Sequence, residues 1–156
     1  MLTLTSQYAL KALIYLVRQT NGYPVAGPRI ARDTKIPAKY LSMVLRELVR
    51  ANVLESACGK GGGFRMARPA RQVSLLEVVA PFEVKFSAKQ TCPFGNEQCS
   101  DDNPCLAHNQ WKTVIENERR FLQRTSVYDV AVPRNGTSTK HRKKKQSKKK
   151  KKRTRS

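Results

Sequence analysis

The chain has 156 residues, with 31 Lys+Arg against 11 Asp+Glu and a formal charge of +20. Residues 140–156 hold 12 of the basic residues and no acidic one, which leaves 19 basic against 11 acidic in residues 1–139. No apolar run approaches the ~18 residues of a membrane span, and the N-terminus lacks the pattern of a secretory signal. We therefore expect a soluble intracellular protein with no membrane partner. Its excess positive charge favours a polyanion, with nucleic acid the first candidate.

Helical patterns dominate the first third of the chain. Apolar residues at helical spacing predict a first helix over residues 5–20. Two more helices are predicted over residues 27–51, where Pro28 suits the first turn of a short helix and Pro37 opens a longer one. The turn between them is Lys35-Ile36. A short helix, a tight turn and a longer one-sided helix form the helix-turn-helix arrangement of DNA-binding proteins.

The longer helix of this pair has two different faces. Its apolar residues recur at the i, i+3, i+4, i+7 spacing of a buried face, and the polar and basic side chains that lie off that face are Lys39, Ser42, Arg46 and Arg50. Base edges come within reach of the start and the outer face of such a helix. We therefore expect DNA contacts from Lys39, Tyr40, Ser42 and Arg46, although Tyr40 fits the apolar face equally well.

A change of pattern after this helix predicts a β-hairpin. Residues 53–57 form a candidate strand, residues 59–63 supply four glycines for a turn, and residues 64–68 alternate apolar and basic side chains as a half-exposed strand does. The glycines do not make a phosphate loop, because no Gly-Lys-Ser/Thr follows a strand and opens a helix. A hairpin directly after a helix-turn-helix is a wing. The predicted fold class is therefore mainly α with a small β-hairpin wing.

The rest of the chain predicts two helices and a tail. Ser74 and Glu77 form a capping box that starts a short helix within residues 73–84. Asn103-Pro104 is typical of the start of a long C-terminal helix, whose apolar residues include Trp111, Val114, Ile115, Phe121 and Leu122. One side of this helix needs a partner surface, which is either a second copy of the chain or its own domain. Residues 133–156 are a low-complexity polybasic tail that we expect to be disordered.

Three of the four cysteines fall within 14 residues. In a reducing cytosol such clustering indicates a metal or redox site rather than structural disulfides. The spacing is Cys92-(6)-Cys99-(5)-Cys105-(2)-His108. We expect Cys105 and His108 on one side of the start of the long helix, where the helix N-terminus favours a thiolate. Three thiolates and one imidazole are adequate ligands for a [2Fe–2S] cluster.

Other interpretations of these residues stay open. A structural zinc site uses the same ligand types, although the close Cys-x(2–4)-Cys pair that zinc sites usually carry is absent. A metal-free thiol redox switch, or cysteines without a function, would have the same spacing. Cys58 lies apart from the other three, in the predicted wing. We expect it to take no part in ligation.

Several motifs together resemble one protein family. They are Ser6-Gln7-Tyr8-Ala9-Leu10, Ile36-Pro37-Ala38-Lys39-Tyr40-Leu41, Gly61-Gly62-Gly63-Phe64-Arg65, Ser74-Leu75-Leu76-Glu77-Val78-Val79, and the three cysteines ahead of a long helix. Over roughly residues 1–130 the chain resembles the Rrf-two family of winged-helix transcription regulators. The resemblance implies a dimeric bacterial DNA-binding protein whose third helix enters the major groove and whose wing reaches the minor groove. It also implies a ligand role for His108, because the matching histidine ligates in an iron–sulfur-cluster member.

Some positions depart from the pattern of this family. Members usually carry an Arg before the wing glycines that probes the minor groove, and Cys58 stands there in this chain. Lys60 is the candidate substitute, and with Arg65 it completes the DNA-binding candidates of the wing. Lys35 occupies a turn position that is often Gly, where a left-handed Lys costs about 1 kcal/mol. Ser42 stands where a cluster-binding member has an acidic residue that discriminates promoters, so we expect a different sequence preference.

These inferences combine into one predicted organisation. Residues 1–84 form the winged helix-turn-helix DNA-binding domain, 85–104 the cysteine-rich cluster loop, 105–132 the dimerisation helix and the end of the body, and 133–156 the tail. The predicted function is a homodimeric transcription regulator, cytoplasmic and nucleoid-associated in a bacterium. It binds a double-stranded DNA operator and senses redox or iron–sulfur status through the cluster.

The alternatives to this function come from two classes. One is a cluster-free winged-helix repressor that responds to a small molecule or to thiol oxidation. The other is a general nucleic-acid-binding protein driven by the basic tail. An enzyme is not expected, because the sequence has no recognisable Ser/His/Asp set, dinucleotide fingerprint or complete phosphate loop.

Overall fold

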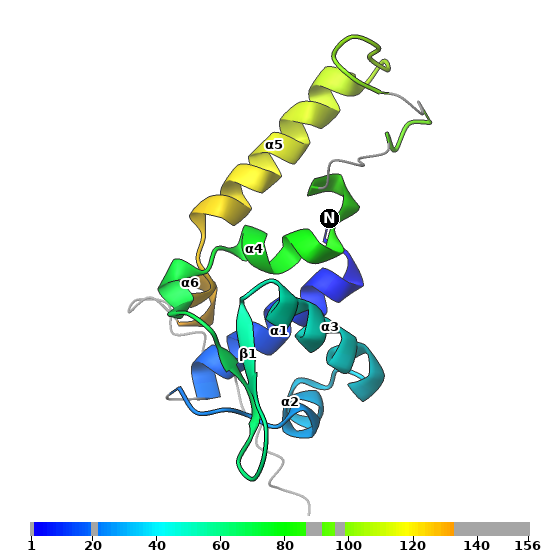
Figure 1. Ribbon diagram of the computed structural model, residues 1–156. Helices are drawn as coiled ribbons and strands as arrows, with labels where there is room; N and C mark the ends of the chain where they lie inside the picture. The colour runs from blue at the N-terminus through cyan, green and yellow to red at the C-terminus, as the bar shows by residue number, and fades with distance from the viewer. Residues whose placement is uncertain (1, 20–21, 87–91, 96–98, 133–156) are drawn as a thin grey trace, which may run out of the picture.

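The computed structural model describes residues 2–19, 22–86, 92–95 and 99–132. Figure 1 shows a helical body with a β-hairpin at one end and a long helix, α5, that extends from the other end. The predicted fold class, mainly α with a small β-hairpin wing, is confirmed. The predicted tail, residues 133–156, lies outside the described residues. No helix in the part of the chain that the structure describes is long and apolar enough to cross a membrane.

Helix α1 (Leu4–Gln19) is the centre of the body and confirms the predicted first helix. It packs against α2, α3, α4 and α6. Its fully buried apolar residues follow the helical spacing on which the prediction rested and are Ala9, Ala12, Leu13 and Leu16. This one-sided burial makes α1 the support on which the other helices of the body rest.

The helix-turn-helix consists of α2 (Gly27–Thr34) and α3 (Ala38–Arg50). The turn residue Lys35 is left-handed, with φ 56°, as expected. The N–H of Ile36 donates to the carbonyl oxygen of Ala31 at 3.2 Å, which closes the end of α2. Helix α3 buries its apolar face through Leu41, Val44, Leu45 and Leu48.

The wing is the antiparallel pair β1 (Leu54–Ala57) and β2 (Gly63–Met66), with Leu54 opposite Met66 and Ala57 opposite Gly63. Phe64 also exchanges two backbone hydrogen bonds of 2.9 Å with Val25, just before α2. Only glycine fits position 63, because its φ is 149° and a Cβ there would lie 2.3 Å from the Val25 carbonyl oxygen. Gly63 therefore allows the wing to lie against the segment that leads into α2.

The predicted capping box is confirmed at the start of α4 (Leu75–Val79). The Ser74 Oγ accepts from the Glu77 N–H at 3.3 Å, and the Glu77 carboxylate accepts from the Ser74 N–H at 2.9 Å. Three short 3₁₀ turns flank this helix, and they are η1 (Ala70–Gln72), η2 (Ala80–Phe82) and η3 (Val84–Phe86). Residues 80–86, directly after α4, thus form a series of tight turns.

The start predicted for the long helix is wrong. Helix α5 spans His108–Arg124, and its N-cap is Ala107 rather than Asn103. Asn103 and Ser100 instead exchange two backbone hydrogen bonds, of 3.2 and 3.3 Å, in a turn ahead of the helix. This turn takes up the donor and acceptor groups that an N-cap at Asn103 would need, so Cys105 precedes the helix.

A short last helix, α6 (Val127–Ala131), was not predicted. It begins with a second capping box, in which the Ser126 Oγ accepts from the Asp129 N–H at 3.2 Å. Helix α6 packs against α1, and Arg18 at the end of α1 donates to the Ala131 carbonyl oxygen at 2.6 Å. The same Ser-x-x-Asp signal is present in the sequence and would have found this helix.

Candidate functional site

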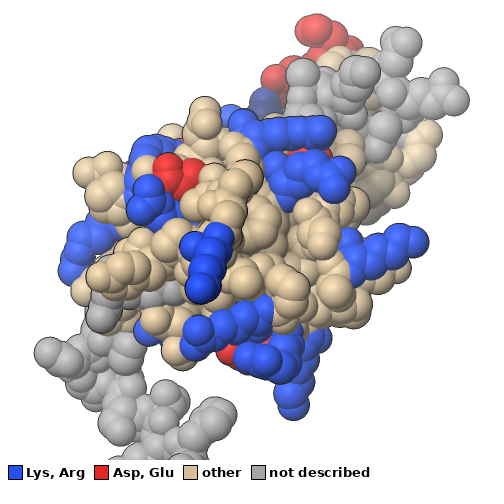
Figure 2. Space-filling model, turned by 60° about the horizontal axis from the view of Figure 1, so that its bottom comes forward, with Lys and Arg blue, Asp and Glu red and all other residues tan. Residues whose placement is uncertain are grey.

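The outer face of α3 is exposed and basic. Lys39, Ser42 and Arg46 are exposed, and Tyr40 is 56% exposed, so Tyr40 does not belong to the core. Figure 2 shows Lys and Arg side chains gathered around the end of the molecule that carries the helix-turn-helix and the wing, with few acidic side chains among them. A face of this kind suits the phosphate backbone of DNA.

Ion pairing divides the basic residues of this face into two groups. Arg50 pairs with Glu47 at 2.7 Å, and Arg65 of the wing pairs with Glu55. Within the described part of the chain, Lys39 and Arg46 have no acidic partner. Their charges are therefore available to a polyanion without the loss of an existing ion pair. For this reason Arg65 is a weaker candidate for a DNA contact than Arg46.

The three clustered cysteines come together in space. The Sγ atoms of Cys92, Cys99 and Cys105 all lie within 4.8 Å of one another, and those of Cys92 and Cys105 are 3.7 Å apart. All three side chains are half-buried, whereas Cys58 is exposed in the wing and does not belong to the group. The structure thus brings together the three cysteines that the sequence grouped.

Turns, rather than helix geometry, position two of these sulfur atoms. The Gly95 N–H donates to the Cys92 carbonyl oxygen at 3.3 Å, and the His108 N–H donates to the Cys105 carbonyl oxygen at 3.0 Å. The predicted reason for the closeness of Cys105 and His108, a shared helix face, is therefore replaced by a turn that leads into α5. The spacing of three residues brings them together in either case.

His108 lies against the group of three cysteine sulfur atoms. Its Nδ1 is 3.0 Å from the Cys99 Sγ, and its Nε2 is 2.9 Å from an oxygen of Asp101. Lys112 donates to both oxygens of Asp101, at 2.8 and 2.7 Å. The hydrogen bond from Lys112, followed by that from His108, holds the pKa of Asp101 below its ordinary value. The sequence interpretation missed Asp101, because an exposed acidic loop residue has no local pattern.

The surroundings of Cys99 disfavour the ionised form of its thiol. A backbone hydrogen bond at Cys105 acts to lower the pKa of the Cys99 thiol. Burial and the neighbouring thiols of Cys105 and Cys92 outweigh it and raise that pKa. Three sulfur atoms this close repel one another as thiolates, so a bound cation is what would allow them to share the site.

A hollow of about 440 Å³ lies beside the sulfur atoms. Its wall includes the cysteines and His108, and its charged residues are the basic Lys85, Lys112 and Arg119 and the acidic Asp101 and Glu116. Phe94, in the segment that follows Cys92, packs edge-on against Trp111 of α5 with ring centroids 5.7 Å apart. This aromatic contact ties the cysteine segment to the long helix.

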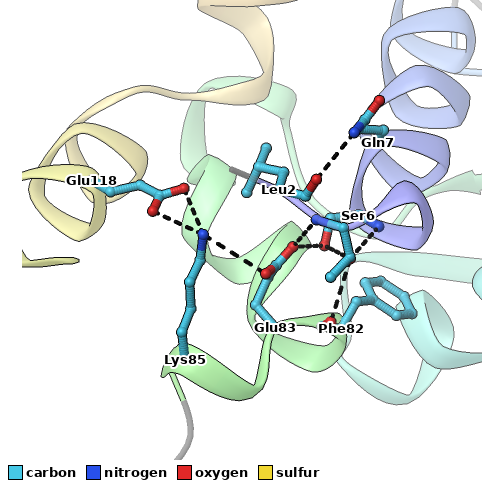
Figure 3. A network of polar contacts seen from close by, with 8 residues as sticks. Leu2, Ser6, Gln7, Phe82, Glu83, Lys85 and Glu118 are labelled. Carbon is cyan, nitrogen blue, oxygen red and sulfur yellow. Dashed lines mark hydrogen bonds and ion pairs between the residues drawn. The ribbon is translucent and has the colours of Figure 1, made fainter. Parts of the chain in front are cut away.

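A polar network connects the cysteine hollow to α1 (Figure 3). Lys85, in the wall of the hollow, donates to both oxygens of Glu118 on α5 at 2.8 Å and lies 3.8 Å from Glu83. Glu83 is 4% exposed and accepts from the Thr3 N–H and the Ser6 hydroxyl, each at 2.6 Å, at the start of α1. The network joins α5, the segment after α4 and the N-terminus of α1.

The charge of Glu83 is supported by its neighbours. Burial acts to raise the pKa of this carboxyl, but hydrogen bonds from Ser6 and Thr3 and the charge of Lys85 hold it below its ordinary value. Sequence reasoning did not find Glu83, Lys85 or Glu118 as members of one network. Their partners lie up to 80 residues away, so no local signal marks them.

Helix α5 divides its apolar residues between two surfaces. Ile115 and Leu122 are buried, and Leu122 belongs to the core of the body. Val114 is 51% and Phe121 is 60% exposed. The predicted single apolar side is therefore divided between buried residues and a stripe that is uncovered in the single chain.

Comparisons with known proteins agree on the kind of protein. The sequence model of the Rrf2 family, described as an iron-dependent transcriptional regulator, matches residues 2–133. A relative from Aquifex aeolicus, named as an HTH-type transcriptional regulator, is 30% identical over 128 residues, which are 81% of this chain and 88% of the relative. These relatives are regulators and not enzymes, as the sequence predicted.

Solved structures with the same fold include two regulators. CymR of B. subtilis superimposes with a TM-score of 0.68 at 17% identity, over 84% of this chain and 95% of CymR. IscR of T. potens has a TM-score of 0.66 at 18% identity, over 83% of this chain and 85% of IscR. At these identities the likeness concerns the fold. The family match and the 30% identical relative establish that this chain is a member of the Rrf2 family of transcription regulators.

Proposed function

We propose that the protein is a homodimeric, operator-binding transcription regulator that senses redox or iron–sulfur status through a [2Fe–2S] cluster held by Cys92, Cys99, Cys105 and His108. The observation that carries the proposal is the meeting of three sulfur atoms within 4.8 Å, with an imidazole nitrogen 3.0 Å from one of them. The family is described as iron-dependent. IscR is one of the solved structures with this fold.

The donor set fits an iron–sulfur group. Cysteine thiolates are the usual ligands of [2Fe–2S] clusters, and histidine is a known substitute. Within the described residues Arg119 of the wall has no acidic partner, and its charge suits the negative charge that three thiolates bring, whereas Lys85 and Lys112 are already paired with carboxylates. When bound, such a cluster takes up or releases an electron, or is lost, and either event changes the charge between the three sulfur atoms. Zinc is the alternative occupant, since the same ligands suit it.

The DNA-binding function rests on α3 and the wing. Lys39 and Arg46 have no acidic partner among the described residues, and Tyr40 and Ser42 lie beside them on the exposed face. We expect this face of α3 to enter the major groove, with Lys60 and Arg65 of the wing at the backbone or minor groove. Residues 1–84 would form this reading head. A DNA-binding regulator of this kind works in the cytoplasm, at the nucleoid.

The second copy is expected on the uncovered stripe of α5. Val114 and Phe121 are seven residues apart, two turns of one helix face, and both are exposed in the single chain. Pairing through this stripe would bury them. Residues 85–104 and 105–132 would then act as the sensing loop and the dimerisation segment of one unit.

The polar network supplies a physical route from the sensor to the reading head. Lys85 contacts the cysteine hollow, α5 through Glu118, and α1 through Glu83. A change of charge at the sulfur atoms acts on this lysine and on the helix that it binds. Because α3 packs against α1, movement of α5 relative to α1 would shift the reading head relative to α5. The switch works only if the cluster is bound better in one of the two arrangements.

An absorbance spectrum of full-length protein purified without oxygen tests the proposal. We expect a red-brown protein with absorbance beyond the protein band and about two irons and two sulfides per chain. Cys92→Ala, Cys99→Ala and Cys105→Ala should each bleach it, and Cys58→Ala is the matched control that should not. A colourless protein that binds zinc, or colour that depends on Cys58, would refute the cluster.

A metal-free thiol switch is the second candidate. The 3.7 Å separation of the Cys92 and Cys105 sulfur atoms favours it, because these two thiols need little movement to form a disulfide. CymR, described as the global cysteine regulator of B. subtilis, has the same fold. Under this alternative, the colourless protein loses two free thiols on mild oxidation, and operator binding changes with that loss.

A further inference from the structure

We infer that Asp101 is a positioning residue that fixes the ring of His108, so that Nδ1 and not Nε2 is the nitrogen that the ring offers to iron. The inference rests on the proposed function and deepens it, since it names the ligand atom and the residue that selects it.

The two ring nitrogens of His108 face different partners. Nε2 is 2.9 Å from a carboxylate oxygen of Asp101, and Nδ1 is 3.0 Å from the Cys99 Sγ. A neutral imidazole carries one N–H, and an ionised carboxylate only accepts hydrogen bonds. The N–H is therefore on Nε2, pointing at Asp101. The lone pair is on Nδ1, pointing toward the three cysteine sulfur atoms, where a ligand atom is needed.

Asp101 is held in place from the same helix that carries His108. Lys112 donates to both carboxylate oxygens, at 2.8 and 2.7 Å. His108 and Lys112 are four residues apart in α5 and so project from one helix face. The side chain of Asp101 is 71% exposed, while that of His108 is 14% exposed. A surface carboxylate thus orients a mostly buried ring through two contacts anchored on one helix.

Ligation through Nε2 would require a different arrangement. The ring would have to turn, give up the hydrogen bond to Asp101 and leave Nδ1 without its present sulfur neighbour. Asp102 provides a matched control, because it is an adjacent exposed carboxylate. Within the described residues it contacts neither His108 nor Lys112. A purely electrostatic effect of one negative charge near the site would be similar for both aspartates, whereas positioning is specific to Asp101.

The first test identifies the ligating nitrogen directly. Full-length protein is produced with histidine labelled with ¹⁵N at either Nδ1 or Nε2, and its cluster is assembled without oxygen and reduced. The hyperfine coupling of the ligating nitrogen is then measured by pulsed electron paramagnetic resonance. The chain has two histidines. The same measurement on His108→Ala shows which part of the nitrogen signal comes from His108. We expect the strong coupling to change from the pattern of ¹⁴N to that of ¹⁵N only in the Nδ1-labelled protein. A change in the Nε2-labelled protein instead overturns the inference.

The second test measures the contribution of Asp101 to holding the cluster. Loss of a partner that orients a ligating histidine typically lowers metal affinity about 10–100-fold. We therefore expect Asp101→Ala to lose its colour at about 10–100-fold lower chelator concentration than the parent, and Asp102→Ala to behave like the parent. Since Asp101 acts through His108, Asp101→Ala should add little in a His108→Ala background.

The outcomes separate this inference from the proposed function. A parent protein that assembles no cluster refutes the proposed function and the inference with it. A parent protein with a cluster, in which Asp101→Ala and Asp102→Ala bleach alike, refutes only the role of Asp101. An equal loss on Asp101→Ala with and without His108 also overturns it, because that result means that Asp101 does not act through the histidine ring.

Discussion

Replacing Glu83 tests whether the buried polar network holds α1 to the rest of the body. Glu83→Ala removes the acceptor of two 2.6 Å hydrogen bonds, from the Thr3 N–H and the Ser6 hydroxyl, and the neighbour of Lys85. Hydrogen bonds to a charged group contribute about 1.5–3 kcal/mol each. The fully buried Ser6 hydroxyl loses its acceptor and keeps only the bond that it accepts from the Thr3 hydroxyl, whereas Thr3 is exposed and water can replace the bond lost from its N–H. We therefore expect a loss of about 2–4 kcal/mol in the free energy of unfolding.

Glu83→Gln separates the hydrogen bonds from the charge. The amide oxygen of Gln still accepts from Thr3 and Ser6, so the loss should be about 1 kcal/mol, that of a weaker bond. The sign of the pH dependence follows from the lowered pKa of Glu83. A carboxyl with a lowered pKa stabilises the fold above its unfolded value, about 4.3, and this contribution is lost as pH falls through the folded value. The Gln variant should lack this part of the acid sensitivity.

Urea unfolding of metal-free, full-length protein measures these effects. Circular dichroism at one fixed protein concentration gives the free energy of unfolding by linear extrapolation, which keeps any dimer contribution constant. Asp102→Ala, which removes an exposed carboxylate, is the control and should change the free energy by less than about 0.5 kcal/mol. If Glu83→Ala unfolds like this control, the network does not hold α1 in place, and the proposed route from sensor to reading head fails with it.

Three further changes test other parts of the molecule. Lys39→Ala and Arg46→Ala should each weaken operator binding by about 1–3 kcal/mol in fluorescence anisotropy if they contact bases, and unchanged binding by both would mean that α3 is not the reading helix. Truncation after Val132 should flatten the salt dependence of DNA binding and leave the ratio of operator to random affinity the same or higher, because flexible lysines contact phosphates; a truncated protein that keeps its general affinity but loses discrimination would contradict this. Phe121→Asp should convert dimer to monomer in sedimentation velocity, whereas Gln123→Glu on another exposed part of α5 should not; a dimer that survives Phe121→Asp has its interface elsewhere.

Local signals in the sequence were enough to predict most of the elements. The capping box at Ser74, the proline at position 28 and the apolar periodicity of α1 and α3 all act through residues within one or two turns. A pattern of that range can be recognised without knowing the fold. The capping box at Ser126 was of the same kind, and α6 was missed although its signal was present.

Local signals were misleading where other contacts compete with them. Asn103-Pro104 is a valid helix start by its chemistry, but a turn between Ser100 and Asn103 uses the same backbone groups. Tyr40 fitted both faces of α3 by its spacing, and its 56% exposure depends on which neighbours the helix packs against. Similarly, the apolar residues of α5 showed one periodic side. Tertiary packing buries Ile115 and Leu122 and leaves Phe121 exposed.

The amino-acid sequence by itself determined the family, the helix-turn-helix with its wing, and the grouping of three cysteines with one histidine, because each of these depends on residue types at short, countable spacings. The tertiary structure alone decided which atoms meet. Asp101 lies on the far side of the His108 ring from Cys99, and Glu83 accepts from a backbone group 80 residues away. Such contacts depend on the directions in which side chains leave elements that pack together, and those directions follow from the whole core rather than from any local stretch of sequence.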